Sequence, residues 1–132
     1  MTTGPDIPLS PFDELIGFEL TEVAPERVVG VLHVTPKLHQ PFGILHGGAM
    51  ATVVETAASY GATLALGGEG VAVGLSNHTD FVRAVREGDL RVEATPLQRG
   101  RTTQLWLVRV SDERDRLVAH GRVRLMNLRE RP

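Results

Sequence analysis

The chain has 132 residues, of which 42% are hydrophobic and 23% are charged, and it contains no cysteine. This length and composition indicate one soluble globular domain, and the lack of cysteine excludes disulfides, thiol nucleophiles and metal sites with Cys ligands. The formal net charge of −2 argues against a general affinity for nucleic acids.

The first eleven residues are rich in Thr, Gly and Pro. They have neither the basic region nor the apolar core of a signal peptide, so we expect a cytoplasmic protein. We predict a flexible N-terminal segment at residues 1–11 and a folded domain at residues 12–132. Ser10 is a candidate cap for a short helix over Pro11–Ile16, which has proline at its first position.

Two strand-like runs follow, at Phe18–Val23 and Arg27–Val34. The segment Ala24-Pro25-Glu26 between them is typical of a turn. Residues 35–45 contain two prolines and a glycine, and they predict a loop.

A long helix is predicted from His46 to about Leu66, where Gly67-Gly68 ends it. The segment is almost wholly apolar or small, and it is about long enough to cross a bilayer. Its many Ala, Gly, Thr and Ser residues favour a helix in the core of the domain instead, and we expect no membrane association. Because a helix that is apolar on all sides is usually surrounded, we expect a curved sheet to wrap it.

The rest of the chain has the pattern of strands, at Val71–Phe81, Leu90–Gln98, Thr103–Ser111 and Leu117–Leu128. The polar residues 112–115 predict a hairpin turn. Strands that cluster around one helix with short connections indicate the α+β class, with an antiparallel sheet packed on that helix. Since the edges of such a sheet invite pairing with another copy, a homodimer is predicted.

Glu55 is the one charged residue between His46 and Leu66. A carboxylate is costly to bury on an apolar helix, so its presence needs a reason. It is either a base or nucleophile in an apolar setting or a solvated residue at the rim of the helix. Ser59 lies one helical turn further on, close enough to bond Glu55 or a bound group.

Gly47 and Gly48 open the same helix, where the backbone N–H groups are unpaired and the dipole is positive. Such donors stabilise an oxyanion that develops on a carbonyl, although a glycine pair also permits close packing. His46 before them is either a helix cap, a core histidine or a site residue. Gln40 in the preceding loop either orients a water or a carbonyl group or is an ordinary surface residue.

No metal or cofactor is expected. The histidine spacing matches no zinc pattern, and the chain has no serine elbow, phosphate loop or dinucleotide fingerprint.

Arginine is concentrated near the C-terminus, where residues 99–132 hold nine arginines against four acidic residues. Arg99 and Arg101 flank Gly100 in a basic turn, and Arg83 follows the end of a predicted strand. These residues either bind phosphates bidentately or belong to solvated strand faces and a plain β-turn.

The segment His39-Gln40-Pro41-Phe42-Gly43-Ile44-Leu45-His46-Gly47-Gly48, followed by Glu55 and Ser59, resembles the hotdog-fold acyl-CoA thioesterases. The likeness covers about residues 12–128. It is strongest to the phenylacetate-degradation type, which includes enterobactin-pathway proofreading thioesterases and dihydroxynaphthoyl-CoA hydrolases. The resemblance implies a curved antiparallel sheet around one long central helix, dimerised into a continuous sheet and commonly paired again into a homotetramer.

The resemblance also implies an active site at the dimer interface. By this resemblance, Gln40, His46 and Gly47 are expected from one subunit, and Glu55 with Ser59 from the other. The Gly47 amide would polarise the thioester carbonyl, and Glu55 would attack it or activate water. Gln40 would position that water or the carboxylate, and His46 would form a hydrogen bond near the thioester.

The resemblance further implies that three arginines, Arg83, Arg99 and Arg101, meet the phosphates of CoA. The residues that match the CoA contacts of the family are Gly74, Phe81, Val82, Arg83, Ala84, Gln98, Arg99, Gly100, Arg101, Thr102 and Thr103.

The chain departs from some relatives, which place His at the position of Phe81 and Pro at the position of Ala84. The Asn77–Phe81 segment also differs from that of the enterobactin-type enzymes, so their aryl substrates do not transfer automatically. The expected activity is hydrolysis of an acyl-CoA thioester to the free acid and CoA, without a metal or cofactor. The alternatives are a hydratase or dehydratase acting on acyl thioesters and a non-catalytic module that binds acyl-CoA.

Overall fold

The computed structural model describes residues 8–130 and 132. Residues 1–7 of the predicted flexible segment lie outside the described residues. The elements in chain order are α1 (Pro11–Ile16), β1 (Phe18–Ala24), β2 (Arg27–Val34), the 3-10 turn η1 (Pro36–Leu38), α2 (Gly47–Leu64), β3 (Val71–Phe81), β4 (Gly88–Arg99), β5 (Thr103–Ser111) and β6 (Leu117–Leu128).

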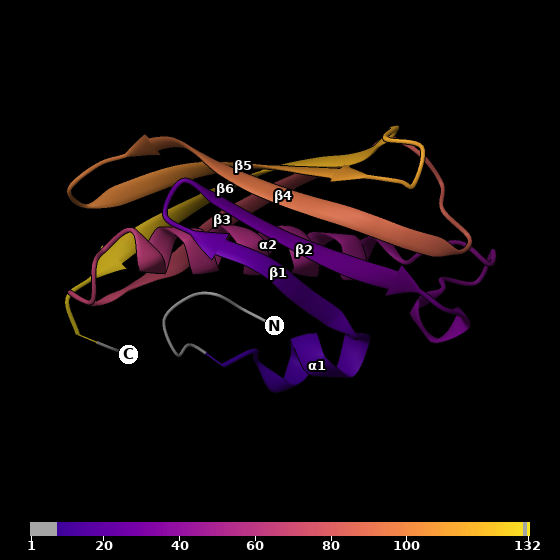
Figure 1. The fold of residues 1–132 in the computed structure, drawn as a ribbon, viewed down its shortest axis with the longest axis horizontal. Coiled ribbons are helices and arrows are strands. Elements are labelled where there is room, and N and C mark those ends of the chain that lie inside the picture. Colours follow the sequence, from indigo (N-terminus) through magenta and orange to yellow (C-terminus); the bar gives the residue numbers. More distant parts are fainter. Residues whose placement is uncertain (1–7, 131) are drawn as a thin grey trace.

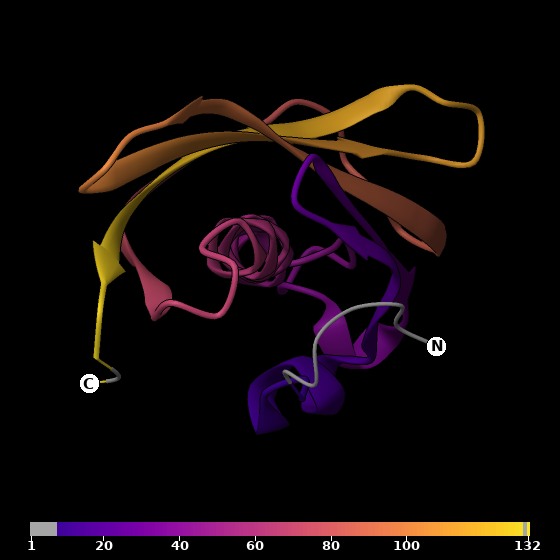
Figure 2. The same cartoon turned by 60° about the vertical axis from the view of Figure 1, so that its left-hand side comes forward.

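The strands form one six-stranded antiparallel sheet in the order β1-β2-β4-β5-β6-β3. Three pairs, β1-β2, β4-β5 and β5-β6, are neighbours in both sequence and space. Helix α2 carries the chain from β2 to the far edge of the sheet, where β3 pairs with β6. The sheet arches over α2 (Figures 1 and 2). This is the predicted α+β hotdog architecture.

The boundaries follow local signals closely. The Ser10 side chain accepts a hydrogen bond from the Asp13 N–H and caps α1 as predicted. Helix α2 begins at Gly47 and ends at Leu64, two residues before the predicted end. Strand β4 is longer than predicted because its pairing with β2 extends to Gly88, a register that sequence alone does not set.

The core lies between the concave face of the sheet and one side of α2. Side chains alternate along β5, so that Trp106, Val108 and Val110 are fully buried. The Trp106 ring lies directly against Gly61 of α2, where an added Cβ would come within 2.4 Å of the ring atom Cη2. Gly61 therefore permits the close approach of the helix to the sheet.

The sheet does not surround α2. The buried residues of the helix face the sheet, whereas Gly48 and Glu55 are exposed on the other side, and Figure 2 shows this side open below the arch. Of the two interpretations of Glu55, a carboxylate in an apolar setting and a solvated residue at the rim of the helix, the single chain shows the exposed position. The sequence pattern predicts a helix surrounded on all sides because small residues such as Ala and Gly count as apolar on both the buried and the exposed face.

Helix α1 packs beside α2 through a buried carboxylate. The Asp13 side chain is only 4% exposed, and it accepts hydrogen bonds of 2.7 Å from the hydroxyls of Ser10 and Thr56. The Tyr60 hydroxyl donates to the Pro8 carbonyl. Burial raises the pKa of Tyr60, and the negative charge of Asp13 acts in the same direction. These contacts fix α1 against the helix.

Within residues 8–130 and 132, no helix is both long and apolar enough to cross a bilayer.

Candidate active site

The N-terminus of α2 presents one free backbone donor. His46 is the N-cap in extended conformation, and its Nδ1 accepts from the Gly48 N–H at 2.7 Å. The N–H groups of Ala49 and Met50 donate to the His46 carbonyl at 3.0 and 3.3 Å. In the part of the chain that the structure describes, the Gly47 N–H has no acceptor. The positive end of the helix thus keeps one donor available for a ligand.

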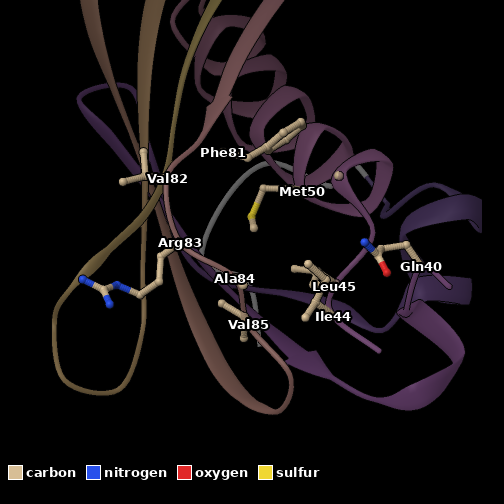
Figure 3. A pocket seen from close by; sticks show the side chains of 10 residues that line it. Gln40, Ile44, Leu45, Met50, Phe81, Val82, Arg83, Ala84 and Val85 are labelled. Atoms are coloured by element: carbon tan, nitrogen blue, oxygen red, sulfur yellow. The ribbon is translucent and has the colours of Figure 1, made fainter. Parts of the chain in front are cut away.

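A pocket of about 350 Å³ opens beside this donor. It is formed by the loop before α2, the first turn of α2 and the segment that follows β3, and its lining is mainly apolar (Figure 3). A concave, mostly apolar pocket with a few polar groups is the usual form of a small-molecule site. The lining residues are Gln40, Ile44, Leu45, Gly47, Met50, Phe81, Val82, Arg83, Ala84 and Val85.

The structure thereby brings together two predicted groups of site residues that are far apart in the sequence. Gln40 and Gly47 meet the segment 81–84 in one pocket. Four lining residues, Ile44, Leu45, Met50 and Val85, were not among the predicted site residues. Ile44 and Leu45 belong to the motif before the helix, whereas Met50 and Val85 carry no sequence signal beyond their apolar character.

Phe81 packs directly on the helix start. A Cβ at position 47 would lie 2.8 Å from Cζ of the Phe81 ring, so a glycine is needed for this approach. The ring is still 59% exposed, which leaves one face accessible from the pocket. The chain after it is held in place because the Val82 and Arg83 N–H groups both donate to the Val118 carbonyl, at 2.8 and 3.1 Å.

Gln40 is fixed by its own loop. Its side-chain oxygen accepts from the Phe42 N–H, and its backbone N–H donates to the Ile44 carbonyl at 2.8 Å. The amide nitrogen has no acceptor among the described residues, and Figure 3 shows it turned toward the pocket. Because one end of the amide is occupied, the free end is a donor of fixed direction.

Glu55 and Ser59 lie on the open side of α2, away from this pocket. The Glu55 carboxylate comes within 3.7 Å of the position that a Cβ on Gly74 would take, so it lies beside the middle of β3. The side chains of Glu55 and Ser59 have no hydrogen-bond or ion-pair partner among the described residues. Glu55 follows Gly47 by eight residues, a separation of about 12 Å along the helix axis. Within one chain, the acid and the free donor are too far apart to act on one carbonyl group.

The arginines predicted to bind phosphates, Arg83, Arg99 and Arg101, lie in two separate regions of the single chain. Arg83 follows β3 near the level where Phe81 pairs with Ala119, and the turn at residues 100–102 lies near the level where Thr103 pairs with Met126. Met126 pairs with Val73 of β3, so the two levels are eight residues apart along this strand, about 26 Å. Figure 3 shows the Arg83 side chain extending away from most of the other lining residues. A single chain does not bring these guanidinium groups to one phosphate.

The two arginines of the turn differ from each other. Arg99 donates to the Pro25 carbonyl at 3.0 Å and pairs with Glu26 at 3.6 Å, so it is engaged with the β1–β2 turn. Arg101 is exposed and has no acidic partner among the described residues. Of the two, Arg101 is the cation available to a ligand.

The described residues contain no group of three or more His, Asp or Glu side chains arranged to hold a metal ion.

Comparison with known proteins identifies the family. The model of the Thioesterase superfamily matches residues 42–119, which include the helix start, Glu55 and the segment that follows β3. The protein Rv1847 of Mycobacterium tuberculosis is 44% identical over all of both chains. Its solved structure agrees with a TM-score of 0.89 at 46% identity, over 93% of this chain and 100% of that one.

Some relatives carry names that state an activity. The 1,4-dihydroxy-2-naphthoyl-CoA hydrolase of Listeria monocytogenes is 34% identical and covers 83% of this chain and 89% of its own. The proofreading thioesterase EntH of Cronobacter turicensis is also 34% identical and covers 83% of this chain and 80% of its own. These matches confirm the resemblance stated above, and with the hotdog architecture they show that the chain belongs to the thioesterase superfamily and is a thioester hydrolase.

Proposed function

We propose that the protein is an acyl-CoA thioesterase, which hydrolyses the thioester to a free carboxylic acid and CoA. The observation that carries this proposal is the free Gly47 N–H at the positive end of α2, since Gly47 lines a mainly apolar pocket. A donor there is suited to a carbonyl oxygen that gains negative charge. The name of the Listeria relative, which specifies a CoA thioester, supports CoA as the carrier of the acyl group.

The complete site in this proposal needs two copies of the chain. Strand β3 is at the edge of the sheet and is 11 residues long, so its outer backbone groups are available for pairing. Antiparallel pairing of two β3 strands would place two α2 helices side by side. Glu55, which lies beside β3, would then approach Gly47 of the other copy. The 12 Å that separate these groups within one chain support this arrangement over a site built in a monomer.

Hydrolysis in this site would begin with the thioester carbonyl oxygen accepting a hydrogen bond from Gly47. The tetrahedral intermediate carries a full negative charge on that oxygen, and loss of one such donor typically costs about 2.7–4 kcal/mol of barrier reduction. Glu55 then acts in one of two ways. It attacks the carbonyl carbon and forms an anhydride that water hydrolyses, or it takes a proton from the water that attacks. In both routes the C–S bond breaks and CoA leaves as the thiolate. The thiolate becomes the thiol by taking a proton from protonated Glu55 in the general-base route, or from water in the anhydride route.

Three further side chains fit supporting roles. Because Nδ1 of His46 accepts from Gly48, a neutral His46 ring carries its proton on Nε2 and is a donor toward the substrate. The free amide nitrogen of Gln40 is a donor to the attacking water or to the carboxylate. The Ser59 hydroxyl, one turn from Glu55, is placed to bond the carboxylate or a bound group.

The experiment that tests the proposal is the release of free thiol from short, long and aryl acyl-CoA by the wild type and by Glu55→Gln. The substitution keeps the size of the side chain and removes its charge, basicity and nucleophilicity. We expect turnover to fall by about 10²–10⁴-fold, while light scattering shows an unchanged dimer. Glu19→Gln on β1, where the carboxylate is also exposed and unpaired among the described residues, is the matched control and should keep wild-type activity.

Near-native turnover in Glu55→Gln would contradict the mechanism. The same assay separates the alternatives. A hydratase would convert an enoyl-CoA to the hydroxyacyl-CoA with no thiol released. A binding module would bind acyl-CoA and release no thiol from any member of the panel.

A further inference from the structure

A buried glutamine joins three elements at the C-terminal end of α2. The Gln104 side chain is only 2% exposed. Its Nε2 donates to the Ala62 carbonyl at 3.0 Å and to Oδ1 of Asn127 at 2.9 Å. Its Oε1 accepts from the Trp106 ring N–H at 2.8 Å. Every hydrogen of the amide group is thus used, which fixes the side chain in one orientation.

Part of this arrangement serves the helix. The Leu66 N–H donates to Thr63 at 3.1 Å, so the Ala62 carbonyl lacks its usual donor four residues later. Gln104 replaces that donor, as the unpaired carbonyls at a helix end require. The bond to Asn127 is not needed for this purpose, and it continues the network toward the surface.

Asn127 donates hydrogen bonds to the backbone of the β4–β5 turn. Its Nδ2 donates to the carbonyls of Gly100 and Arg101, both at 3.1 Å, and its backbone N–H donates to the Thr102 carbonyl at 2.9 Å. Three successive carbonyl groups of the turn therefore accept hydrogen bonds from one residue. With these carbonyls held, the backbone that carries the Arg101 side chain has a fixed position.

Arg101 lines a pocket of about 260 Å³ at this end of the molecule, together with Asn127 and Arg129. Neither arginine has an acidic partner among the described residues. Glu69 lines the same pocket, so its lining holds two arginines and one carboxylate, and the net charge of +1 favours an anion.

We propose that Asn127, oriented by Gln104, is a positioning residue that fixes the β4–β5 turn so that Arg101 meets the phosphates of CoA. This rests on the proposed function, with the thioester at Glu55. Ala62, the residue bonded by Gln104, lies about 10 Å along the helix from Glu55, and the turn lies beyond it. The pantetheine arm of CoA spans such a gap. A turn that is ordered before binding loses little conformational entropy when the phosphate arrives.

The test measures binding of CoA and of pantetheine, which lacks the nucleotide and its phosphates, by isothermal titration calorimetry. In Asn127→Ala we expect the Kd for CoA to rise about tenfold and the Kd for pantetheine to stay unchanged, because only the phosphate contact is charge-assisted and depends on the turn. In Arg101→Ala the Kd for CoA should rise at least as much. If Asn127 acts through Arg101, the variant that carries both substitutions should have nearly the same Kd for CoA as Arg101→Ala alone. The expected difference between the two Kd values is below about twofold.

The matched control is Thr63→Val, which removes a hydrogen bond of 3.0 Å between the Ala72 N–H and the Thr63 hydroxyl at the same end of α2. It should leave both affinities unchanged. The proposal is overturned if Asn127→Ala weakens CoA and pantetheine equally, if the control shows the same change as Asn127→Ala, or if the effects of Asn127→Ala and Arg101→Ala multiply.

Failure of this inference and failure of the proposed function give different results. Calorimetry needs no hydrolysis, so the positioning role is measurable even in a protein that releases no thiol. Unchanged CoA affinity in Arg101→Ala would overturn the positioning role while thiol release by the wild type continued to support the thioesterase. Absence of thiol release from every acyl-CoA would overturn the thioesterase alone.

Discussion

The two sides of helix α2 differ in how their polar groups are satisfied. On the side facing the sheet, the Ala62 carbonyl is bonded by Gln104 and the Trp106 ring fills the space above Gly61. On the open side and at the helix start, the Glu55 carboxylate and the Gly47 N–H have no partner in the part of the chain that is described. Satisfied groups hold the fold, whereas unsatisfied groups at the surface are available to a substrate.

The carboxylates of Asp13 on α1 and Glu55 on α2 show the same difference between satisfied and unsatisfied polar groups. Asp13 is buried and accepts from two hydroxyl groups, which is how a protein stabilises a buried acid. Glu55 is exposed and unpaired. Asp13 joins α1 to α2, and Glu55 is free to act on a ligand.

The largest expected effect on stability is on the side of α2 that faces the sheet. Gly61→Val places a branched side chain where even a Cβ would lie 2.4 Å from the Trp106 ring. Overpacking of a filled core costs about 1–3 kcal/mol, and urea unfolding should show a loss of this size. Ser59→Val on the open side, where the wild-type hydroxyl has no partner in the described chain, should change the free energy of unfolding by less than about 0.5 kcal/mol. Equal losses in both variants would remove the distinction between the two sides.

A smaller effect, on activity alone, is expected at the helix start. Gly47→Ala brings a methyl group within 2.8 Å of Phe81, and the exposed ring has room to shift, so the melting temperature should hardly change. Crowding around the Gly47 N–H should lower kcat/KM by about tenfold, a part of what loss of an oxyanion donor costs. Adding Phe81→Ala to this variant frees the space and should restore some activity. A Gly47→Ala variant with unchanged kcat/KM would show that this donor is not used.

The smallest effect is the pH dependence that Tyr60 contributes. Its pKa is raised in the folded protein above the ordinary 10.0, by burial and by the charge of Asp13. The folded protein therefore holds the phenol proton more tightly than the unfolded chain, and the stabilisation is full below pH 10 and lost as the pH rises through the folded pKa. In urea unfolding between pH 8 and 11, the stability difference between wild type and Tyr60→Phe should narrow at the alkaline end. A difference that stays constant would contradict the assigned environment.

Much of the fold follows from local sequence signals. Ser10 before Pro11 predicts the start of α1, and the alternation around Trp106 and along β6 predicts strands with one buried face. These signals are short-range consequences of capping and of the period-2 strand pattern, so they can be read without knowing the fold. The start of β4 does not follow from such signals, because its pairing with β2 sets it.

The candidate site was predictable in its residue types more than in its geometry. Gly47 and Glu55 stand out on an apolar helix, and the motif around them resembles one family. The exposure of Glu55 and the engagement of Arg99 by Glu26 depend on contacts between residues distant in sequence. Gln104 and Asn127 gave no signal at all, since an isolated Gln or Asn in a strand has no characteristic spacing.

The sequence by itself determined the α+β class, the long central helix and the donors and acid that this helix carries, because these depend on composition and on periodicities of a few residues. The tertiary structure decided which side of the helix stays open, that the Gly47 N–H is the donor left free, and that Arg101 and not Arg99 is available. The reason is physical: burial and hydrogen-bond satisfaction are properties of the packed chain, and the same side chain is structural or reactive according to what the fold places against it.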